Sequence, residues 1–357
     1  MNPYDFVPLG RPSPRKQPPG HDRLARTGGV IRARLKTLGP FLIAEQDYAV
    51  GQGAIRPVKQ GAIIPGSSLK GMLRAVAEMV AGGCISASSS LYSHGRYQYR
   101  HAKEPTGFAP CDDIDELCIT CRMFGALPQG SAWKGLVAPG EGRLCEPDRA
   151  SIVGPYHIIV GQPKPDHHAF YVERTNNSTD KTIRGRKAYY HHPDQITEST
   201  PARKASFGAR QTIQVRAVDR GHVYQLSVHH QGLDEAEYAL LLYAMFLEPG
   251  LAHKLGWGKP HGLGSVAIEP LSVEQTDLLA RYRGSARATE RCEGAAAAEY
   301  IAQLTQGMRD DHSERMAALR RLLAFPGAQS ERWSYPSNRW FQDNPAASLE
   351  EFNDRHG

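Results

Sequence analysis

The start of a helix is encoded in residues 63–74, Ile-Ile-Pro-Gly-Ser-Ser-Leu-Lys-Gly-Met-Leu-Arg. The Pro-Gly pair interrupts an apolar segment, and Ser67 or Ser68 can cap the helix that follows. Because Lys70 and Arg74 are four positions apart, they project from one face of this helix. A helix N-terminus with glycine, serine and lysine beside it suits an anionic ligand such as phosphate. Taken alone, the segment fits a capped surface helix with two solvated charges equally well.

Length and charge bound the class of protein. A chain of 357 residues, 40% of them hydrophobic, can bury a core as one large domain with insertions or as two domains. The net charge of +6 is compatible with nucleic acid but does not identify it as the partner. The excess of basic residues is concentrated in residues 181–216, which contain eight basic and two acidic residues. This segment is the best candidate for a phosphate-facing surface.

The sequence contains no run of about eighteen apolar residues, so we expect no transmembrane helix and no membrane partner. The first residues lack the charged-then-apolar pattern of a secretory signal. We therefore expect a cytoplasmic protein, in which six cysteines are free thiols or metal ligands rather than disulfides.

Hydrophobic periodicity predicts the order of the regular elements. Residues 29–36 alternate apolar with basic, which is typical of a half-exposed strand with a positive outer face. A helix is expected over 67–80, and a β-hairpin is expected over 211–229. A second helix over 233–246 and a closing strand over 264–268 complete the series. This βαββαβ order predicts an α+β fold with a ferredoxin-like (RRM-like) core.

Composition divides the chain into an arm, a core and an extension. Residues 1–28 are rich in proline, glycine and arginine and predict an extended N-terminal arm. The core is expected over 29–270, with one insertion at about 82–123 and a long basic insertion at about 161–209. Residues 271–357 predict a helical and polar C-terminal extension.

Three cysteines, Cys111, Cys118 and Cys121, lie in the first insertion. The two-residue spacing of the last two lets their thiolates converge on one ion, and Cys111 can loop back to join them. An insertion without its own apolar core needs such a cross-link to fold stably. Four protein ligands would make the ion structural, and free thiols in a loop are the alternative. The candidates for the fourth ligand are His101, His94 and Cys84.

Three motifs that occur in a fixed order resemble a known family. Residues 63–74 closely resemble the signature helix of the repeat-associated mysterious protein (RAMP) superfamily. Residues 118–125, Cys-Ile-Thr-Cys-Arg-Met-Phe-Gly, resemble the Cys-x-x-Cys-Arg-x-Phe-Gly element of type III backbone subunits. Residues 255–266 resemble the superfamily's C-terminal Gly-rich loop and strand. The stretches 2–9 and 184–191 further resemble one type III-associated subfamily.

RAMP proteins are RNA-binding subunits of CRISPR effector complexes, so the resemblance implies a backbone subunit that binds guide RNA (CRISPR RNA) and presents it for pairing with target RNA. The implied partners are other effector subunits, including further backbone copies, and a separate nuclease in a type III or type III-derived setting such as type VII. The resemblance also implies an RRM-like fold and a thumb-like hairpin within 161–209. It implies zinc held by three cysteines and a preceding histidine, for which His101 is preferred over His94.

Contacts to RNA phosphates would hold a guide without reading its sequence. Arg32 and Arg34 share one strand face, and the cations of residues 184–191 interleave with aromatic residues as in single-strand binders. The alternative for Arg32 and Arg34 is a solvated strand face, and the alternative for residues 184–191 is a polar loop. Residues 256–264 fit either a loop beside RNA or tight core packing. The RNA-binding candidates are Arg32, Arg34, Gly66, Ser67, Ser68, Lys70, Arg74, Arg184, Arg186 and Lys187.

The sequence favours a subunit that does not cleave RNA. By resemblance, catalytic backbone subunits carry an acidic residue where this chain has Ala-Ile-Arg at residues 54–56. Asp47 is the best candidate if the chain is instead a metal-dependent endoribonuclease that cuts target RNA. A guide-processing endonuclease would need a general base such as His261 or His253 beside the Gly-rich loop. A zinc scaffold without nucleic acid is a further alternative.

Overall fold

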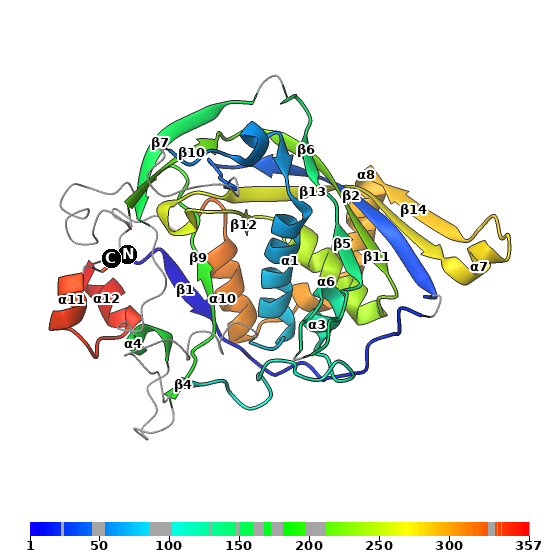
Figure 1. Ribbon diagram of the computed structural model, residues 1–357, viewed down its shortest axis with the longest axis horizontal. Helices are drawn as coiled ribbons and strands as arrows, with labels where there is room; N and C mark the ends of the chain where they lie inside the picture. The colour runs from blue at the N-terminus through cyan, green and yellow to red at the C-terminus, as the bar shows by residue number, and fades with distance from the viewer. Residues whose placement is uncertain are drawn as a thin grey trace.

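The computed structural model describes residues 1–22, 25–44, 54–85, 102–128, 130–147, 150–159, 168–172, 181–196, 212–327, 333, 335–336 and 338–356. They form a mixed α+β structure in which two long helices pack side by side against an antiparallel sheet (Figure 1). Within these ranges, no helix is long and apolar enough to cross a membrane.

The central sheet is built around β2 (Thr27–Thr37), which lies between β11 (Val223–Gln231) and β13 (Ser265–Asp277). All its pairings are antiparallel, in the order β12-β13-β2-β11-β6-β3, and β5 also pairs with β11. Along β2, buried Ile31, Ala33 and Leu35 alternate with more exposed basic residues, as the sequence predicted. The short strands are β3 (Ile63–Ile64), β5 (Val137–Pro139), β6 (Gly142–Leu144) and β12 (His253–Lys254).

Both predicted core helices are present. Helix α1 (Gly66–Ala81) buries the predicted apolar stripe and packs against α6 (Glu235–Phe246) and β5. The N-cap of α6 is Asp234, whose side chain accepts from the Glu237 N–H while the Glu237 side chain accepts from the Asp234 N–H. Three further helices pack around this pair: α3 (Ile119–Phe124), α8 (Gly294–Leu304) and α10 (Glu314–Leu323).

The predicted serine cap of α1 is wrong. The N-cap is Pro65, no side chain caps this end, and the helix begins at Gly66. The Pro65 carbonyl accepts the N–H groups of Ser68 and Leu69 at 3.0 and 3.2 Å, so the first turn closes before either serine could act as cap.

The predicted hairpin over 211–229 is also wrong in its pairing, although its strands exist. Strand β10 (Thr212–Val218) pairs with β7 (Ile152–Ile159) in a separate two-stranded sheet, whereas β11 enters the central sheet. A small second core of Leu42, Ile158 and Val215 among others lies under this ribbon. Both edges of β11 are occupied, by β2 on one side and by β5 and β6 on the other, so β10 pairs elsewhere.

The two ends of the chain meet. Strand β1 (Tyr4–Val7) pairs with β9 (Arg186–Tyr189), so the arm and part of the basic insertion fold onto each other instead of extending freely. The Asn2 N–H donates to Asn353 Oδ1 at 2.8 Å. Aromatic residues fill the junction, which also contains α4 (His168–Tyr171), α11 (Asn338–Asp343) and α12 (Leu349–His356). A parallel pair of two-residue strands, β4 (Ala102–Lys103) and β8 (Lys181–Thr182), lies in this part of the chain.

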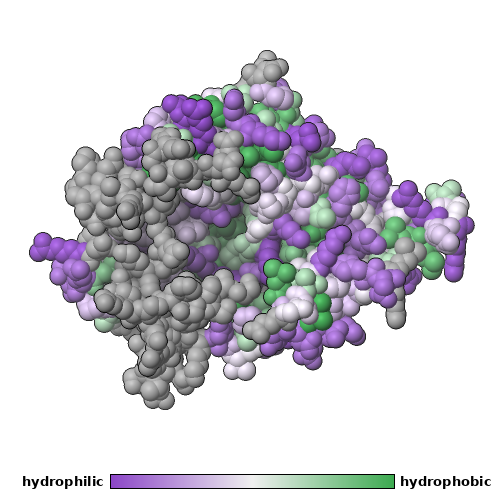
Figure 2. Space-filling view, in the orientation of Figure 1, coloured by the Kyte–Doolittle hydropathy of each residue, from purple (hydrophilic) through white to green (hydrophobic). Residues whose placement is uncertain are grey.

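The segment after residue 270 is not helical from its start. Strand β13 runs on to Asp277, and α7 (Leu278–Tyr282) and β14 (Thr289–Glu293) complete a projecting finger, defined here as residues 272–293 (Figure 1). Figure 2 shows apolar residues among the polar ones on this projection. The Tyr282 side chain is 84% exposed at its tip. Helices follow after the finger, including the short α9 (Gln306–Arg309).

An internal ion pair fixes α3 to α6. The Arg122 Nε donates to Glu237 Oε1 at 2.7 Å, and the two side chains are only 5% and 3% exposed. Arg122 also donates to the Leu117 carbonyl at 3.0 Å, and its own carbonyl accepts from Trp133 Nε1 at 2.9 Å. The Arg of the Cys-x-x-Cys-Arg motif therefore orients the segment that carries the cysteines.

Candidate metal centre and nucleic-acid interface

Four cysteine side chains converge beside the C-terminal end of α1. The sulfur atoms of Cys84, Cys111, Cys118 and Cys121 all lie within 4.8 Å of one another, and Cys84 Sγ is 3.5 Å from Cys121 Sγ. Zinc–sulfur bonds of about 2.3 Å in a tetrahedron place sulfur atoms about 3.8 Å apart, so this cluster is the right size for one ion. The donors are compatible with zinc, and four ligands from one chain would leave no position open to substrate.

The local fold explains how Cys84 reaches the other three. Helix α1 ends at Ala81, and its C-cap Gly82, with a φ of +64°, turns the chain back toward α3. A Cβ at Gly82 would lie 2.1 Å from the Arg11 carbonyl oxygen, so only glycine fits. Cys118 is the N-cap of α3 and Cys121 lies in its first turn. Hydrogen bonds from the neighbouring thiols lower the pKa of Cys118, which favours a thiolate there.

The structure brings together the three cysteines that their spacing had predicted as ligands of one ion. It adds Cys84, one of the three candidates for the fourth ligand. Cys84 is buried and in contact with the cluster. His101 and His94, like Asp47, lie outside the described residues.

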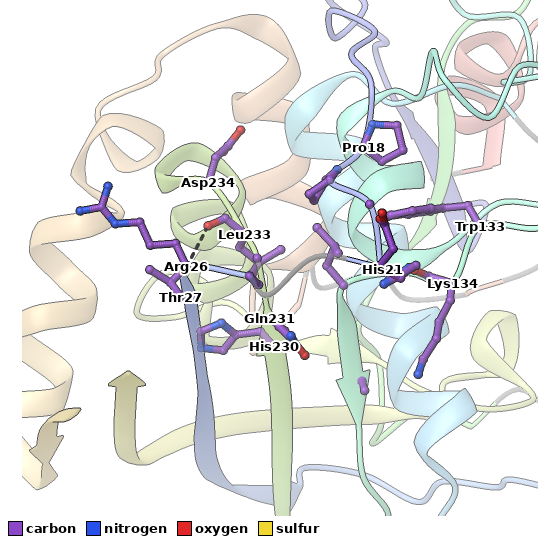
Figure 3. Close-up of a pocket in the computed structure, with 18 of the residues that line it drawn as sticks. Pro18, His21, Arg26, Thr27, Trp133, Lys134, His230, Gln231, Leu233 and Asp234 are labelled. Carbon is purple, nitrogen blue, oxygen red and sulfur yellow. Dashed lines mark hydrogen bonds between the residues drawn. The ribbon is translucent and has the colours of Figure 1, made fainter. Parts of the chain in front are cut away.

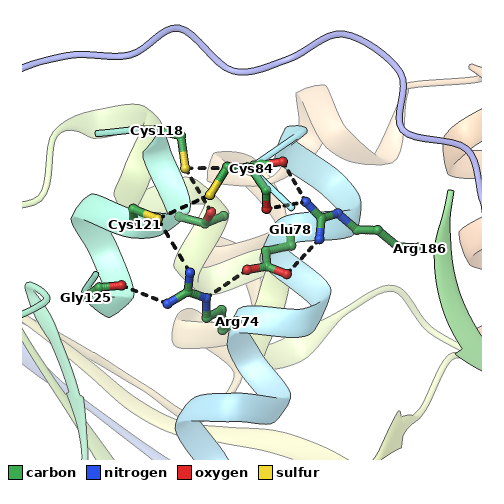
Figure 4. Close-up of polar contacts among 9 residues, drawn as sticks. Arg74, Glu78, Cys84, Cys118, Cys121, Gly125 and Arg186 are labelled. Carbon is green, nitrogen blue, oxygen red and sulfur yellow. Dashed lines mark hydrogen bonds and ion pairs between the residues drawn. The ribbon is translucent and has the colours of Figure 1, made fainter. Parts of the chain in front are cut away.

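Two predicted RNA-binding cations point at this cluster (Figure 4). Arg74 donates to Glu78 Oε1 and to the Gly125 carbonyl, both at 2.8 Å, and to Cys121 Sγ at 3.5 Å. Arg186 donates to Glu78 Oε2 at 2.8 Å and to the carbonyl oxygens before and at Cys84. Both guanidinium groups therefore have internal partners.

Lys70 lies one helical turn before Arg74 and differs from it. No carboxylate lies within salt-bridge distance of its amine among the residues that the structure describes. Burial lowers the pKa of Lys70, as do the nearby charges of Arg74 and Lys134. Lys70 and Lys134 make the start of α1 electropositive, and within the described residues no side chain caps this helix end. A Cβ at Gly66 would lie 2.3 Å from the Pro139 carbonyl oxygen. Glycine at this position therefore lets the helix start pack closely against β5.

On β2, Arg34 is exposed and lies opposite Gln225 and Glu269 in the neighbouring strands. Arg32 is half-buried, with Nη1 3.6 Å from Glu274 Oε2. This outer face therefore carries cations that are already partly neutralised by the adjacent strand.

The predicted basic surface of residues 184–191 faces inward. Lys187 Nζ lies 3.7 Å above the centroid of the Tyr4 ring and donates to the Tyr171 hydroxyl at 3.2 Å. Burial lowers the pKa of Lys187 to about 7. Arg184 forms an ion pair with Glu350. These residues turn inward because β9 pairs with β1, a partner that local sequence does not reveal.

The Gly-rich loop is shaped by packing. Its four glycines, at 256, 258, 262 and 264, all have positive φ. A Cβ at Gly256 would lie 2.1 Å from the Leu42 carbonyl oxygen, and one at Gly264 would lie 2.2 Å from that of Leu255. His253 and His261 are buried, at 1% and 4% exposure, and His253 Nε2 is 2.9 Å from the Met245 carbonyl.

Sequence reasoning missed a cavity of about 1400 Å³ between the N-terminal arm and the ends of β11 and α6 (Figure 3). His21 of the arm stacks on Trp133 with ring centroids 4.2 Å apart, and its Nε2 is 2.7 Å from the Lys134 carbonyl. His230 also lines this cavity, and neither ring nitrogen has a hydrogen-bond partner among the described residues. An isolated His–Trp contact across 112 positions gives no local sequence signal.

His230 should make the protein acid-sensitive. Burial, with a smaller effect of His229, lowers the pKa of His230 from 6.5 to about 4. Below pH 6.5 the unfolded chain binds a proton at this ring and the folded protein does not, so stability falls by about 1 kcal/mol per pH unit toward pH 4. We expect His230→Leu to flatten the pH dependence of urea unfolding between pH 7 and 5. His229→Leu, on the exposed side of the same strand, is the matched control, and equal curves for the two variants would refute the assignment.

Comparison with known proteins agrees with this geometry. A family model, described as the RAMP superfamily, matches residues 34–267, well over half of the chain. The match runs from the end of β2 through α1, the cysteine cluster and α6 to the start of β13. No curated protein matches the chain. The extent of the family match is sufficient to conclude that the chain belongs to the RAMP superfamily.

Proposed function

We propose that this chain is a backbone subunit of a CRISPR effector complex, which binds guide RNA and presents it for pairing with target RNA without cleaving it. RAMP proteins generally work with RNA in CRISPR ribonucleoprotein complexes. The observation that carries the proposal is the electropositive start of α1, where Lys70 has no carboxylate partner among the described residues. Gly66, Ser67 and Ser68 would present N–H and hydroxyl groups to the same phosphates.

The proposed fold is a ferredoxin-like core. Strand order β13-β2-β11-β6, with α1 after β2 and α6 after β11, supports it, because the order of a βαββαβ unit in such a sheet is 4-1-3-2. The proposed complex contains further copies of this subunit, other effector subunits and a separate nuclease of a type III or type VII setting. The proposed location is the cytoplasm.

Target cleavage by this chain at Asp47 is the alternative. It would need a carboxylate or metal ligand near the RNA. The burial of His253 and His261 disfavours the separate alternative in which one of them is the general base of a guide-processing endonuclease. Asp47→Ala in an otherwise complete complex tests the alternative. Loss of target cutting with guide binding intact would establish the nuclease and overturn the non-cleaving proposal.

Lys70→Ala tests the RNA proposal. We expect weaker binding of single-stranded guide RNA, by a similar factor for guides of different sequence, because phosphate contacts carry no sequence information. The slope of log K against log salt should flatten by about 0.7, the value for one phosphate contact on a single strand. Fluorescence anisotropy across a salt series measures both.

The control is Arg339→Ala on α11, whose side chain is 89% exposed and lies 3.7 Å from Asp343. It removes one positive charge and should leave the salt slope unchanged. A Lys70→Ala loss confined to some guide sequences, or a slope equal to that of the control, would contradict the phosphate role.

A further inference from the structure

The contacts around the cysteine cluster form a continuous ionic chain. Arg74 joins Cys121 to Glu78, and Glu78 joins Arg74 to Arg186 through its two carboxylate oxygens, each at 2.8 Å (Figure 4). Arg186 then returns to the Gly83 and Cys84 carbonyls at 2.6 and 2.9 Å. The chain begins at one cysteine of the cluster and ends at the backbone of another.

These groups are largely buried. Side-chain exposure is 24% for Arg74, 15% for Glu78 and 14% for Arg186. Removing three charges from water is costly unless each has a partner, and here two guanidinium groups share one carboxylate. One positive charge is therefore left over, on the side that faces the sulfur atoms.

A positive charge beside a four-thiolate site with a divalent ion is stabilising. Four thiolates and one divalent cation leave two net negative charges, which burial makes unfavourable. An N–H donor to a thiolate sulfur lowers this cost, and groups that contact metal ligands typically change metal affinity by about 10–100-fold when they are removed. The contact from Arg74 Nη2 to Cys121 Sγ has this geometry.

We infer that the chain holds a four-cysteine metal site, completed by Cys84, in which Arg74, Glu78 and Arg186 are positioning residues that neutralise and orient the ligands. Arg74 acts on the Cys121 sulfur, Arg186 fixes the backbone at Cys84, and Glu78 aligns both guanidinium groups. This inference goes beyond the proposed RNA function, since no part of it requires RNA.

The inference divides the two cations of the signature helix between two tasks. Lys70 and Arg74 are one turn apart, about 6 Å along the helix axis. Arg74 contacts Cys121 Sγ, whereas Lys70 lies one turn nearer to the electropositive start of α1. Arg74 is used inside the protein and is not a phosphate contact, whereas Lys70 remains available to RNA.

The test measures metal and RNA binding on the same variants of the full chain. Zinc affinity is obtained by competition with a chelator, and the ligand set is read from the visible spectrum after substitution with Co²⁺ alone. The variants are Arg74→Lys, Arg74→Ala and Glu78→Gln, with Lys70→Ala as the matched control from the same helix. Salt slopes for RNA are measured with zinc in excess, so that the site is filled in every sample.

We expect zinc affinity to fall about 10–100-fold in Arg74→Ala and Glu78→Gln, less in Arg74→Lys, and not at all in Lys70→Ala. The RNA salt slope should change only in Lys70→Ala. Glu78→Gln keeps the side-chain shape, so it remains informative if Arg74→Ala does not fold. Unchanged zinc affinity in both Glu78→Gln and Arg74→Lys would overturn the positioning role.

The reverse pattern is equally decisive. A flatter RNA slope in Arg74→Lys or Arg74→Ala with normal zinc affinity would make Arg74 a phosphate contact. Failure of the RNA proposal alone, with no salt effect for Lys70→Ala, leaves the zinc results standing. The Co²⁺ spectrum separates the ligand sets. Cys84→Ser should lose part of the sulfur-to-metal absorption. Full sulfur-to-metal absorption in Cys84→Ser, together with a change of the cobalt d–d bands in His101→Ala, would make His101 the fourth ligand and exclude Cys84.

Discussion

Cys84→Ser is expected to release the metal and to melt the fold around α3. Structural zinc contributes about 10–16 kcal/mol of apparent binding free energy in small zinc domains, so a lost ligand removes several kcal/mol of stability. The segment that holds Cys111, Cys118 and Cys121 has little regular structure beyond α3, and the cluster ties it to α1. For a domain of this size the midpoint of thermal unfolding should fall by roughly 10 °C.

Differential scanning calorimetry with zinc analysis of the same sample measures this effect. Cys145→Ser is the matched control, because Cys145 is exposed and lies outside the cluster. A strong chelator should lower the midpoint of the parent protein and of Cys145→Ser, and should change Cys84→Ser little further. Full zinc content and an unchanged midpoint in Cys84→Ser would contradict the four-cysteine site.

Arg122→Leu is expected to destabilise the protein by about 3–5 kcal/mol. The substitution leaves the Glu237 carboxylate buried at 3% exposure without its cation, and an uncompensated buried charge has this cost. Glu237 still accepts the Asp234 N–H at 3.0 Å, so it cannot simply turn toward solvent without uncapping α6. Urea unfolding with far-UV circular dichroism measures the change.

A double-mutant cycle separates the ion pair from the lost packing. Adding Glu237→Gln to Arg122→Leu removes the unpaired charge and keeps a side chain that can accept the Asp234 N–H. We expect the double variant to be more stable than Arg122→Leu alone, with a coupling energy of about 1–3 kcal/mol. Additive effects of the two substitutions would show that the charges do not interact.

Elements with their own local signal could be predicted from the sequence. Helices α1 and α6 were expected within one or two residues at each end, because each carries a run of apolar residues. Three of the four clustered cysteines were identified because they lie within eleven residues of one another. Cys84 was weighed but not preferred, because the family that the sequence resembles holds zinc with three cysteines and a preceding histidine. Cys84 is 27 positions before Cys111, and the turn at Gly82 that returns it is a three-dimensional property.

Features that depend on distant partners could not be predicted in this way. Lys187 looks basic and available in sequence, but β1 places Tyr4 against it from the far end of the chain. The pairing of β10 with β7 links segments that are more than fifty residues apart, whereas a short turn favoured β11. The finger was not predicted for the same reason. Its composition suits a helix, and only the pairing of β13 with β2 and of β14 with β13 makes these residues strands.

The finger also provides a fixed reference point for measuring distances. Strand β13 is paired to β2 as far as Asp277 opposite Thr27, and to β14 on its other side. A strand held on both edges has little freedom to move, so the paired part of the finger keeps a defined position relative to the central sheet, whereas α7 at the tip has no buried residue to fix it. A spectroscopic label at an exposed residue of β14, such as Glu290 opposite Gln275, would therefore report distances from the central sheet with less spread than a label at Tyr282.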